Sequence, residues 1–252
     1  MKMLIRFFQR LYFVYATALF ALIVLLIFPV SLVAVPFGRV RGGNIILRVA
    51  SAWADLWFVL VFIRQKNIYE VSLDRSRSYI FVGNHNSYFD AIVLLKALKS
   101  NFRALGRAET AAVPIFGYIY KNAIVTVDRS SPENRKKSVE HLISFIRKGI
   151  SVAVFPEGTF NMSTNPLKDF YDGAFRVAIE TQTPIKPFLI LNSFNIMHYS
   201  SVFSLSPGSN SVVFLEEISV EGFTMDSLPA LKQKVYNLMQ EGLIKYNAPW
   251  IK

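Results

Sequence analysis

A histidine and an aspartate five residues apart are the first residues in this sequence whose types and spacing suit acid–base chemistry. His85 and Asp90 lie in the segment 84–90 (NHNSYFD), directly after the apolar run 79–82, which is typical of a buried strand. A turn between them would bring the Asp90 carboxylate against one imidazole nitrogen and leave the other to accept a hydroxyl proton. The same spacing fits a capping box, in which Asp90 only serves the N-terminus of the next helix. Both interpretations stay open on spacing alone.

A second polar loop, 155–159 (FPEGT), also follows an apolar run, 151–155. Its proline and glycine predict a sharp turn that presents Glu157 and Thr159 near the same edge. The plain alternative is an ordinary turn with a solvated glutamate. If the two apolar runs belong to one sheet, both loops can face one cleft, and this favours a shared site.

The elements that must position these loops can be read from the alternation of patterns after residue 67. Short β-branched or aromatic runs predict strands, and amphipathic stretches predict helices. Ser131 and Pro132 are typical of a helix start, and Gly149 is typical of its end. This alternation predicts an α/β layered sheet with helices on both faces, whose sites lie beyond the strand carboxyl ends. We expect strands at 79–82, 123–127, 151–155, 185–191 and 211–215, and helices at 90–98, 132–148, 173–181 and 228–246.

The composition indicates contact with a membrane. The 252 residues are 52% hydrophobic and 18% charged, with a mean hydropathy of +0.34, which is more apolar than most soluble proteins. This composition excludes a disordered chain. The absence of cysteine excludes disulfide scaffolds, cysteine nucleophiles, thiolate zinc sites and iron–sulfur clusters.

The positive charge is concentrated near the N-terminus. Of a net charge of +11, most lies in residues 1–66, which hold eight Lys or Arg and one acid, Asp55. A basic and apolar segment suits an anionic bilayer surface better than a nucleic acid.

The N-terminal segment contains an apolar run long enough to span a bilayer. No charged residue occurs between Arg10 and Arg39, and roughly 20 helical residues cross a hydrocarbon core of about 30 Å. The run exceeds the roughly 7–15 apolar residues of a signal peptide, so a retained anchor is favoured over a cleaved leader. Pro29 and Pro36 are expected to kink or end a helix within the run.

A second apolar stretch, 45–63, contains Arg48 and Asp55 besides Trp53 and Trp57. This mixture predicts an amphipathic helix at the membrane interface, with the tryptophans at headgroup depth. A transmembrane helix and a two-helix anchor in one leaflet both remain open. We therefore expect membrane-associated helices over residues 1–66 and a catalytic domain over residues 67–252.

Together these motifs resemble the sequence blocks of the PlsC-type lysophospholipid acyltransferases, which are relatives of 1-acylglycerol-3-phosphate acyltransferase. The resemblance extends over roughly residues 82–190 in the family's order, and four ordered blocks are far more specific than either loop alone. The blocks are Asn84-His85 with Asp90; Gly106-Arg107-Ala108-Glu109 with Pro114, Gly117 and Val127-Asp128-Arg129; Phe155-Pro156-Glu157-Gly158-Thr159; and Pro184-Ile185-Lys186-Pro187.

The resemblance implies an α/β fold with a mixed sheet flanked by helices, preceded by a membrane-anchoring helical segment. It implies transfer of a fatty acyl group from an acyl carrier protein or coenzyme A thioester to a lysolipid hydroxyl, as in phospholipid biosynthesis. His85 would be the general base and Asp90 its orienting partner. Direct attack needs no acyl-enzyme, in agreement with the missing cysteine. The residues expected to bind substrate are Asn84, Ser87, Arg107, Glu109, Glu157, Gly158 and Thr159.

The resemblance also implies partners and a location. Membrane lipids and the thioester donor are the expected partners, with no nucleic acid, no metal and no resident cofactor. In a bacterium the catalytic domain would lie on the cytoplasmic side of the inner membrane.

The sequence departs from the family pattern at Phe160, where the family usually has an arginine that helps to hold the acceptor phosphate. This favours an anionic or zwitterionic acceptor that is held differently, such as a lyso-aminolipid. Arg107 replaces a more usual lysine and keeps a positive charge there. A hydrolase using the same cleft and a non-catalytic lipid-binding protein are the alternative functions. Further candidate cations are Lys121, Arg129, Lys168 and Arg176.

Overall fold

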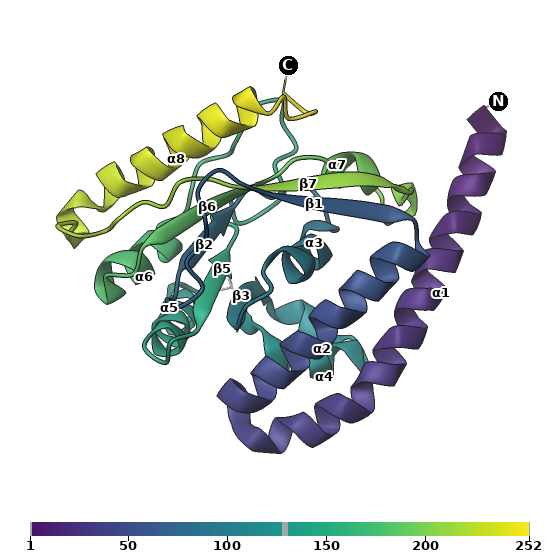
Figure 1. The fold of residues 1–252 in the computed structure, drawn as a ribbon, viewed down its shortest axis with the longest axis horizontal. Coiled ribbons are helices and arrows are strands. Elements are labelled where there is room, and N and C mark those ends of the chain that lie inside the picture. Colours follow the sequence, from purple (N-terminus) through teal and green to yellow (C-terminus); the bar gives the residue numbers. More distant parts are fainter. Residues whose placement is uncertain (1, 128–130, 252) are drawn as a thin grey trace.

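The computed structural model describes residues 2–127 and 131–251 of the chain (Figure 1). Within these residues a mixed sheet of seven strands lies between two layers of helices, in the strand order β1-β7-β6-β2-β5-β3-β4. The predicted α/β class is therefore confirmed. The strands are β1 (Ile63–Tyr69), β2 (Ile80–Gly83), β3 (Phe102–Arg107), β4 (Val125–Val127), β5 (Ser151–Val154), β6 (Ile185–Ile190) and β7 (Gly208–Phe214).

The helices described by the structure include two long ones at the N-terminus. The helices are α1 (Lys2–Ala34), α2 (Gly38–Leu60), α3 (Asp90–Ala97), α4 (Phe116–Ala123), α5 (Pro132–Ile146), α6 (Gly173–Thr181), α7 (Ser193–Ile196) and α8 (Leu228–Lys245), and the 3-10 turns are η1 (Val35–Phe37), η2 (Ala108–Ala112), η3 (Val202–Ser204) and η4 (Met225–Ser227).

Five neighbouring strands, β6, β2, β5, β3 and β4, run parallel to one another. β7 runs antiparallel to β6, and β1 pairs in parallel with β7 at the end of the sheet. The carboxyl ends of the five parallel strands meet at one edge, where α/β folds place their sites. The loops after β2 and β5 both leave from this edge, so the two polar loops share it as predicted.

Each face of the sheet has its own hydrophobic core. Helices α5, α6 and α8 cover one face around side chains such as Val152 and Phe175. Helices α1 to α4 cover the other face around Phe58, Phe81 and Phe89. Because α2 supplies part of the second core and β1 begins before residue 66, the N-terminal segment is packed into the sheet. The division of the chain at residue 66 stays a prediction.

The long helix α1 does not end at Pro29, contrary to one of the two outcomes expected from the sequence. It continues to Ala34, and the break occurs at η1, which contains Pro36 and is followed by Gly38 with φ +80°. A proline removes one intrahelical hydrogen bond, and the packing of α1 along α2 stabilises the helix across that gap.

The two tryptophans of α2 pack against protein, and their predicted position at headgroup depth stays a prediction. Trp53 and Trp57 are buried against α1, where the Phe20 ring lies edge-on to both. The indole nitrogen of Trp57 donates a hydrogen bond to the carbonyl oxygen of Ala16 at 3.0 Å. Helix α1 thus gives Trp57 both an apolar contact for its ring and a hydrogen-bond acceptor for its N–H, which a membrane–water interface would otherwise provide.

Most predicted elements are confirmed with ends that differ by a few residues, and α6 matches the expected range. Strand β4 begins later than predicted because residues up to Ala123 belong to α4. The N-cap is confirmed, since the Ser131 side chain accepts a hydrogen bond from the backbone N–H of Asn134 at 3.1 Å. Strands β1 and β3 and helix α4 were not predicted.

Strand β3 escaped prediction because it contains a buried charge. The Arg103 guanidinium donates hydrogen bonds to the carbonyl oxygens of Phe102 at 2.7 Å, Arg39 at 2.7 Å and Val40 at 3.1 Å. It also lies 5.1 Å from the ring centroid of Phe145, and burial lowers the pKa of Arg103 to about 10. These contacts join β3 to the first turn of α2.

Gly42 marks a close approach between the start of α2 and the end of α1. A Cβ at Gly42 would lie 2.2 Å from the carbonyl oxygen of Ala34. We expect Gly42→Ala to lower Tm in detergent by several degrees, corresponding to about 1–3 kcal/mol, because backbone must move. Gly173→Ala is the control, because its methyl group would meet only Val139, at the ordinary contact distance of 3.7 Å. This variant should leave Tm unchanged or raise it. Equal losses in both variants would contradict this account.

Candidate active site

The loop that carries His85 begins at a rigid point of the sheet. A Cβ at Gly83, the last residue of β2, would lie 2.2 Å from the ring of Phe188 on β6. The next residue, Asn84, is fully buried and exchanges two hydrogen bonds with the backbone of Ile190, its Oδ1 accepting at 2.8 Å and its Nδ2 donating at 2.9 Å. These bonds tie the end of β2 to the end of β6. The predicted contact of Asn84 with substrate stays a prediction.

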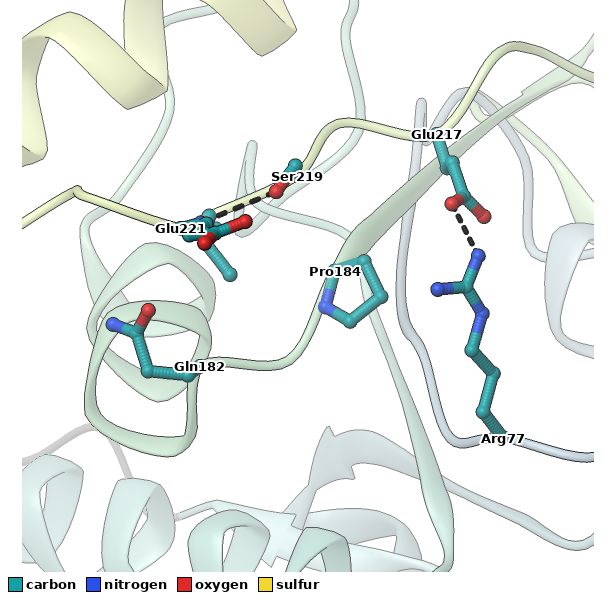
Figure 2. Close-up of a pocket in the computed structure, with 7 residues that line it drawn as sticks. Arg77, Gln182, Pro184, Glu217, Ser219 and Glu221 are labelled. Carbon is teal, nitrogen blue, oxygen red and sulfur yellow. Dashed lines mark hydrogen bonds and ion pairs between the residues drawn. The ribbon is translucent and has the colours of Figure 1, made fainter.

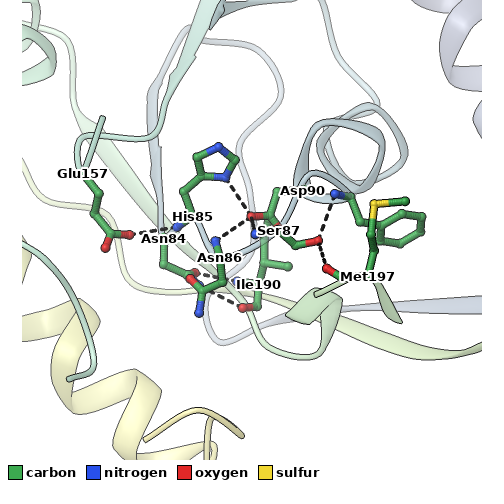
Figure 3. A network of polar contacts seen from close by, with 9 residues as sticks. Asn84, His85, Asn86, Ser87, Asp90, Glu157, Ile190 and Met197 are labelled. Atoms are coloured by element: carbon green, nitrogen blue, oxygen red, sulfur yellow. Dashed lines mark hydrogen bonds and ion pairs between the residues drawn. The ribbon is translucent and has the colours of Figure 1, made fainter. Parts of the chain in front are cut away.

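The Asp90 carboxylate lies at the centre of the loop (Figure 3). Its Oδ2 atom lies 2.8 Å from Nδ1 of His85 and accepts hydrogen bonds from the backbone N–H groups of Asn86 at 2.8 Å and Ser87 at 3.0 Å. Asp90 is fully buried in the first turn of α3. An ionised carboxylate can only accept, so the imidazole proton lies on Nδ1 and the lone pair lies on Nε2.

Only part of the predicted capping box is present, since the N-cap residue of α3 is Phe89 and no side chain caps it. Asp90 reaches back to the N–H of Ser87, and the Ser87 hydroxyl accepts a hydrogen bond from the N–H of Phe89 at 3.0 Å. The same hydroxyl donates to the carbonyl oxygen of Met197, which ties the loop to the segment after β6. One carboxylate therefore orders the helix start and orients the histidine.

Aromatic rings hold the His85 imidazole on two sides. The ring stacks on Phe155 with centroids 4.4 Å apart, and Phe160 lies edge-on at 4.5 Å. Tyr88 in turn contacts Phe160 at 4.6 Å. The His85 side chain is 20% exposed, and no residue in the described ranges hydrogen-bonds to Nε2. Nε2 thus has no protein partner among these residues and has the lone pair that a general base needs.

The turn after β5 lies directly against the His85 loop. Oε1 of Glu157 accepts a hydrogen bond from the backbone N–H of His85 at 2.8 Å, and Oε2 accepts one from the backbone N–H of Lys168 at 2.9 Å. Glu157 is 1% exposed, and burial raises its pKa to about 7 despite these two donors. In this arrangement Glu157 braces the backbone of the site, and its predicted contact with substrate stays a prediction.

The other two residues of the turn have different surroundings. Gly158 has φ +72°, in the left-handed region that favours glycine, and its N–H donates to the carbonyl oxygen of Phe155 at 3.1 Å. Thr159 is exposed, and its hydroxyl accepts a hydrogen bond from Nζ of Lys168 at 2.6 Å. The structure thus places a cation at this turn, beside Phe160.

Two predicted substrate-binding residues stand apart from this network. Arg107 is exposed at the carboxyl end of β3, on the same edge of the sheet, and Glu109 is exposed in η2. No hydrogen bond or ion pair joins either side chain to the His85 network within residues 2–127 and 131–251. Asp128 and Arg129 of the second sequence block lie outside the described residues.

A separate hollow of about 350 Å³ lies near the amino-terminal ends of β2 and β6, away from His85 (Figure 2). Arg77, Pro184 and Glu217 line it, and Arg77 pairs with Glu217 across it. Nothing about this hollow resembles the acid–base arrangement at the opposite edge. Across the described ranges, no group of three or more His, Asp and Glu side chains could hold a metal ion.

Comparison with known proteins assigns the chain to a family. The model of the Acyltransferase family matches residues 61–191, which is more than half of the chain. The chain belongs to the acyltransferase family. The matched range contains both loops of the site, and the resemblance inferred from the sequence blocks is confirmed.

This acyltransferase is distantly similar in sequence to several proteins named 1-acyl-sn-glycerol-3-phosphate acyltransferase. It is 27% identical to mouse 1-acyl-sn-glycerol-3-phosphate acyltransferase alpha over 216 residues, covering 83% of this chain and 74% of the relative. The human protein of that name is 26% identical with the same coverage. The 1-acyl-sn-glycerol-3-phosphate acyltransferase of Cocos nucifera is 23% identical, and the match covers 86% of this chain and 68% of that relative. The fold matches PlsC, the 1-acyl-sn-glycerophosphate acyltransferase of Thermotoga maritima, with a TM-score of 0.77, full coverage of both chains and 20% identity.

Sequence reasoning missed several residues of the candidate site that act through their backbone groups. The N–H of Asn161 donates to the carbonyl oxygen of His85 at 2.7 Å, and the carbonyl of Met197 receives the Ser87 hydroxyl. Any residue type could supply such backbone groups, so no sequence signal marks them. Phe155 lies at the end of an apolar run, and only the tertiary structure shows that its ring stacks on the histidine.

The raised pKa of Glu157 predicts a pH-dependent stability. The folded protein binds this proton more tightly than the unfolded chain, whose glutamate has its ordinary pKa of 4.5. The contribution of this group to the free energy of unfolding is therefore fully present below pH 4.5 and is lost as pH rises from there through about 7, by about 3 kcal/mol in all. Glu157→Gln keeps a neutral side chain and should flatten this decline when Tm is measured from pH 5 to 8.5 in one detergent. Glu133→Gln, at an exposed helix position, controls for the loss of one charge. Parallel profiles for the wild type and Glu157→Gln would contradict the prediction.

Proposed function

We propose that this acyltransferase moves a fatty acyl group from a thioester of acyl carrier protein or coenzyme A to the hydroxyl of a membrane lysolipid. The observation that carries the proposal is the 2.8 Å contact between Nδ1 of His85 and Oδ2 of Asp90, with Nε2 left unbonded at a partly open ring. The distant relatives named for acylation of 1-acyl-sn-glycerol-3-phosphate support the same reaction class.

The proposed step balances without a protein nucleophile. Nε2 of His85 takes the hydroxyl proton while the lysolipid oxygen attacks the thioester carbonyl carbon. The tetrahedral intermediate collapses as the carbon–sulfur bond breaks, and the departing thiolate takes the proton from the imidazolium. The buried Asp90 carboxylate stabilises the imidazolium in between. The N–H of Gly158 already donates within its own turn, so the oxyanion needs other donors.

Replacing the proposed base or its partner should abolish or slow transfer. We expect His85→Ala to remove detectable turnover, and Asp90→Asn to lower kcat on the order of 10³-fold, because the amide cannot stabilise the imidazolium. The assay is mass spectrometry of lipids made by the purified protein from one acyl thioester and mixed lysolipids. Asp226→Asn, at an exposed turn before α8, is the matched control. Near-normal turnover in His85→Ala would support a non-catalytic role, and free fatty acid in excess of acylated lipid would support a hydrolase.

The acceptor head group is the finer part of the proposal. At residue 160 an aromatic ring packs between His85 and Tyr88, where the family pattern usually has an arginine. The positively charged side chain that contacts this turn is that of Lys168, whose ammonium group donates a hydrogen bond to the Thr159 hydroxyl. We infer that Lys168 and Arg107 attract an anionic or zwitterionic head group in place of residue 160, and that a lyso-aminolipid acceptor competes with lysophosphatidic acid.

Introducing an arginine at residue 160 should shift the preference between the two acceptors toward lysophosphatidic acid. We expect Phe160→Arg to raise the ratio of kcat/KM for lysophosphatidic acid over a lyso-aminolipid about tenfold or more, since a charge-assisted bond to phosphate is worth about 1.5–3 kcal/mol. Phe160→Leu controls for the lost edge contact with His85. An unchanged ratio in Phe160→Arg, or a strong preference of the wild type for lysophosphatidic acid, would count against this acceptor assignment.

Membrane attachment is proposed from the two faces of α1. One side of the helix, including Ala16, Ile23 and Ile27, is buried against protein, whereas the other side is exposed and still apolar. Within the described residues, the helical range Phe7–Leu60 contains most of α1 together with η1 and α2. It includes a stretch long and apolar enough to cross a membrane, with a mean hydropathy of 3.0 in its most apolar window. An exposed apolar helix face of this length suits a lipid environment. The exposed apolar side chains of α1 include Phe7, Phe8, Leu11, Val14, Leu22, Leu25, Leu26, Val30, Leu32 and Val33.

A further inference from the structure

The turn η3 on the catalytic side of the molecule exposes apolar side chains beside α1. Val202 is 40% exposed and Phe203 is 59% exposed. The ring of Phe203 lies edge-on to that of Phe13 in α1, with centroids 4.8 Å apart. The apolar surface of α1 therefore continues onto η3.

A hollow of about 520 Å³ lies between the same two segments. Its size is within the range of ligand pockets, and most of its lining is apolar. Such a hollow suits an acyl chain better than a polar ligand. The residues that line it are Phe8, Gln9 and Tyr12 from α1 and Leu205, Ser206 and Pro207 after η3.

The charge pattern around η3 matches a lipid surface. Residues 187–215, which include η3, contain no Asp, Glu, Lys or Arg. Arg10 follows Gln9, which lines the hollow, and Arg64 of β1 lies in register with Ser209 at the start of β7. Both arginines are exposed, and neither forms an ion pair within residues 2–127 and 131–251. An uncharged apolar patch with arginines at its margin is typical of surfaces that contact anionic bilayers.

Hydrogen bonds fix η3 relative to the site. The N–H of His198 donates to the Ser204 hydroxyl at 2.7 Å, and the N–H of Ser206 donates to the carbonyl oxygen of Ile196 at 2.9 Å. Met197, between these residues, accepts the Ser87 hydroxyl of the His85 loop. A lipid contact at η3 therefore orients the catalytic loop toward the bilayer.

We propose that Val202 and Phe203 form a second membrane contact, which inserts into a lipid leaflet beside α1 while a bilayer acyl chain occupies the adjoining hollow. The contact rests on the membrane attachment proposed for α1. It holds the carboxyl edge of the sheet against the leaflet, from which a one-chain acceptor reaches Nε2 of His85 without crossing water.

The absence of cysteine allows a direct test of depth. Val202→Cys is labelled with a polarity-sensitive fluorophore, and the full chain is mixed with phosphatidylethanolamine–phosphatidylglycerol vesicles that carry spin-labelled lipids. Val14→Cys, 63% exposed on α1, reports the proposed anchor. Ile244→Cys, 54% exposed on α8, is the control, because α8 and α1 cover opposite faces of the sheet (Figure 1).

Each pattern of quenching decides a different point. Quenching at residues 202 and 14 but not at 244 is the expected result. Quenching at residue 14 alone overturns the η3 contact and leaves the anchor standing. No quenching at 14 or 202 overturns both, whereas acyl transfer measured with detergent-dispersed substrates still tests the reaction separately.

A functional variant gives an independent readout. We expect Phe203→Ser to lower the rate on vesicle-borne lysolipid roughly tenfold, corresponding to about 1.4 kcal/mol of lost apolar contact, and to leave the rate on detergent-dispersed lysolipid unchanged. Ile244→Ser should change neither rate. Equal rates for Phe203→Ser and the wild type on vesicles would overturn the proposal. A parallel loss in detergent would indicate damage to the fold and also count against it.

Discussion

One buried carboxylate oxygen organises the site, and most of the other features can be understood from what it requires. Oδ2 of Asp90 is surrounded by the ring N–H of His85 and two backbone N–H groups, so the loop must turn tightly from the end of β2 into α3. That turn needs a fixed start. Asn84 bonds to β6, and Glu157 holds the backbone of the next residue, His85, from the loop after the neighbouring strand. The free side of the imidazole is left for chemistry.

The N-terminal helices and the site share a core. Phe89, which immediately precedes Asp90, stacks on Phe58 of α2 with centroids 5.2 Å apart and contacts Trp57 at 6.2 Å. Arg103 joins the start of α2 to β3 through carbonyl oxygens. The N-terminal segment is therefore part of the scaffold that positions the His85 loop, and not a flexible tether.

The sequence predicted the parts of the site whose chemistry is local. His85 and Asp90 are five residues apart after an apolar run, and a turn of that length restricts where the two side chains can go. Strand β1 was missed because it lies at the end of the sheet and carries polar side chains. Strand β3 was missed because a charged residue such as Arg103 does not suggest a buried strand. The protein contacts of the tryptophans could not be predicted, because an apolar pattern does not distinguish a protein neighbour from lipid. The partner of Trp57 is the carbonyl oxygen of Ala16, which is distant in sequence.

The position of β1 has a consequence for how the chain assembles during synthesis. β1 follows the N-terminal helices directly, yet its neighbour in the sheet is β7. The strand that begins at residue 63 therefore cannot pair until the strand that begins at residue 208 has been synthesised. The ribosome delivers α1 and α2 long before this partner emerges. Until then their apolar faces have neither the sheet nor its helices to cover them, and early capture by a bilayer would protect the nascent chain from aggregation.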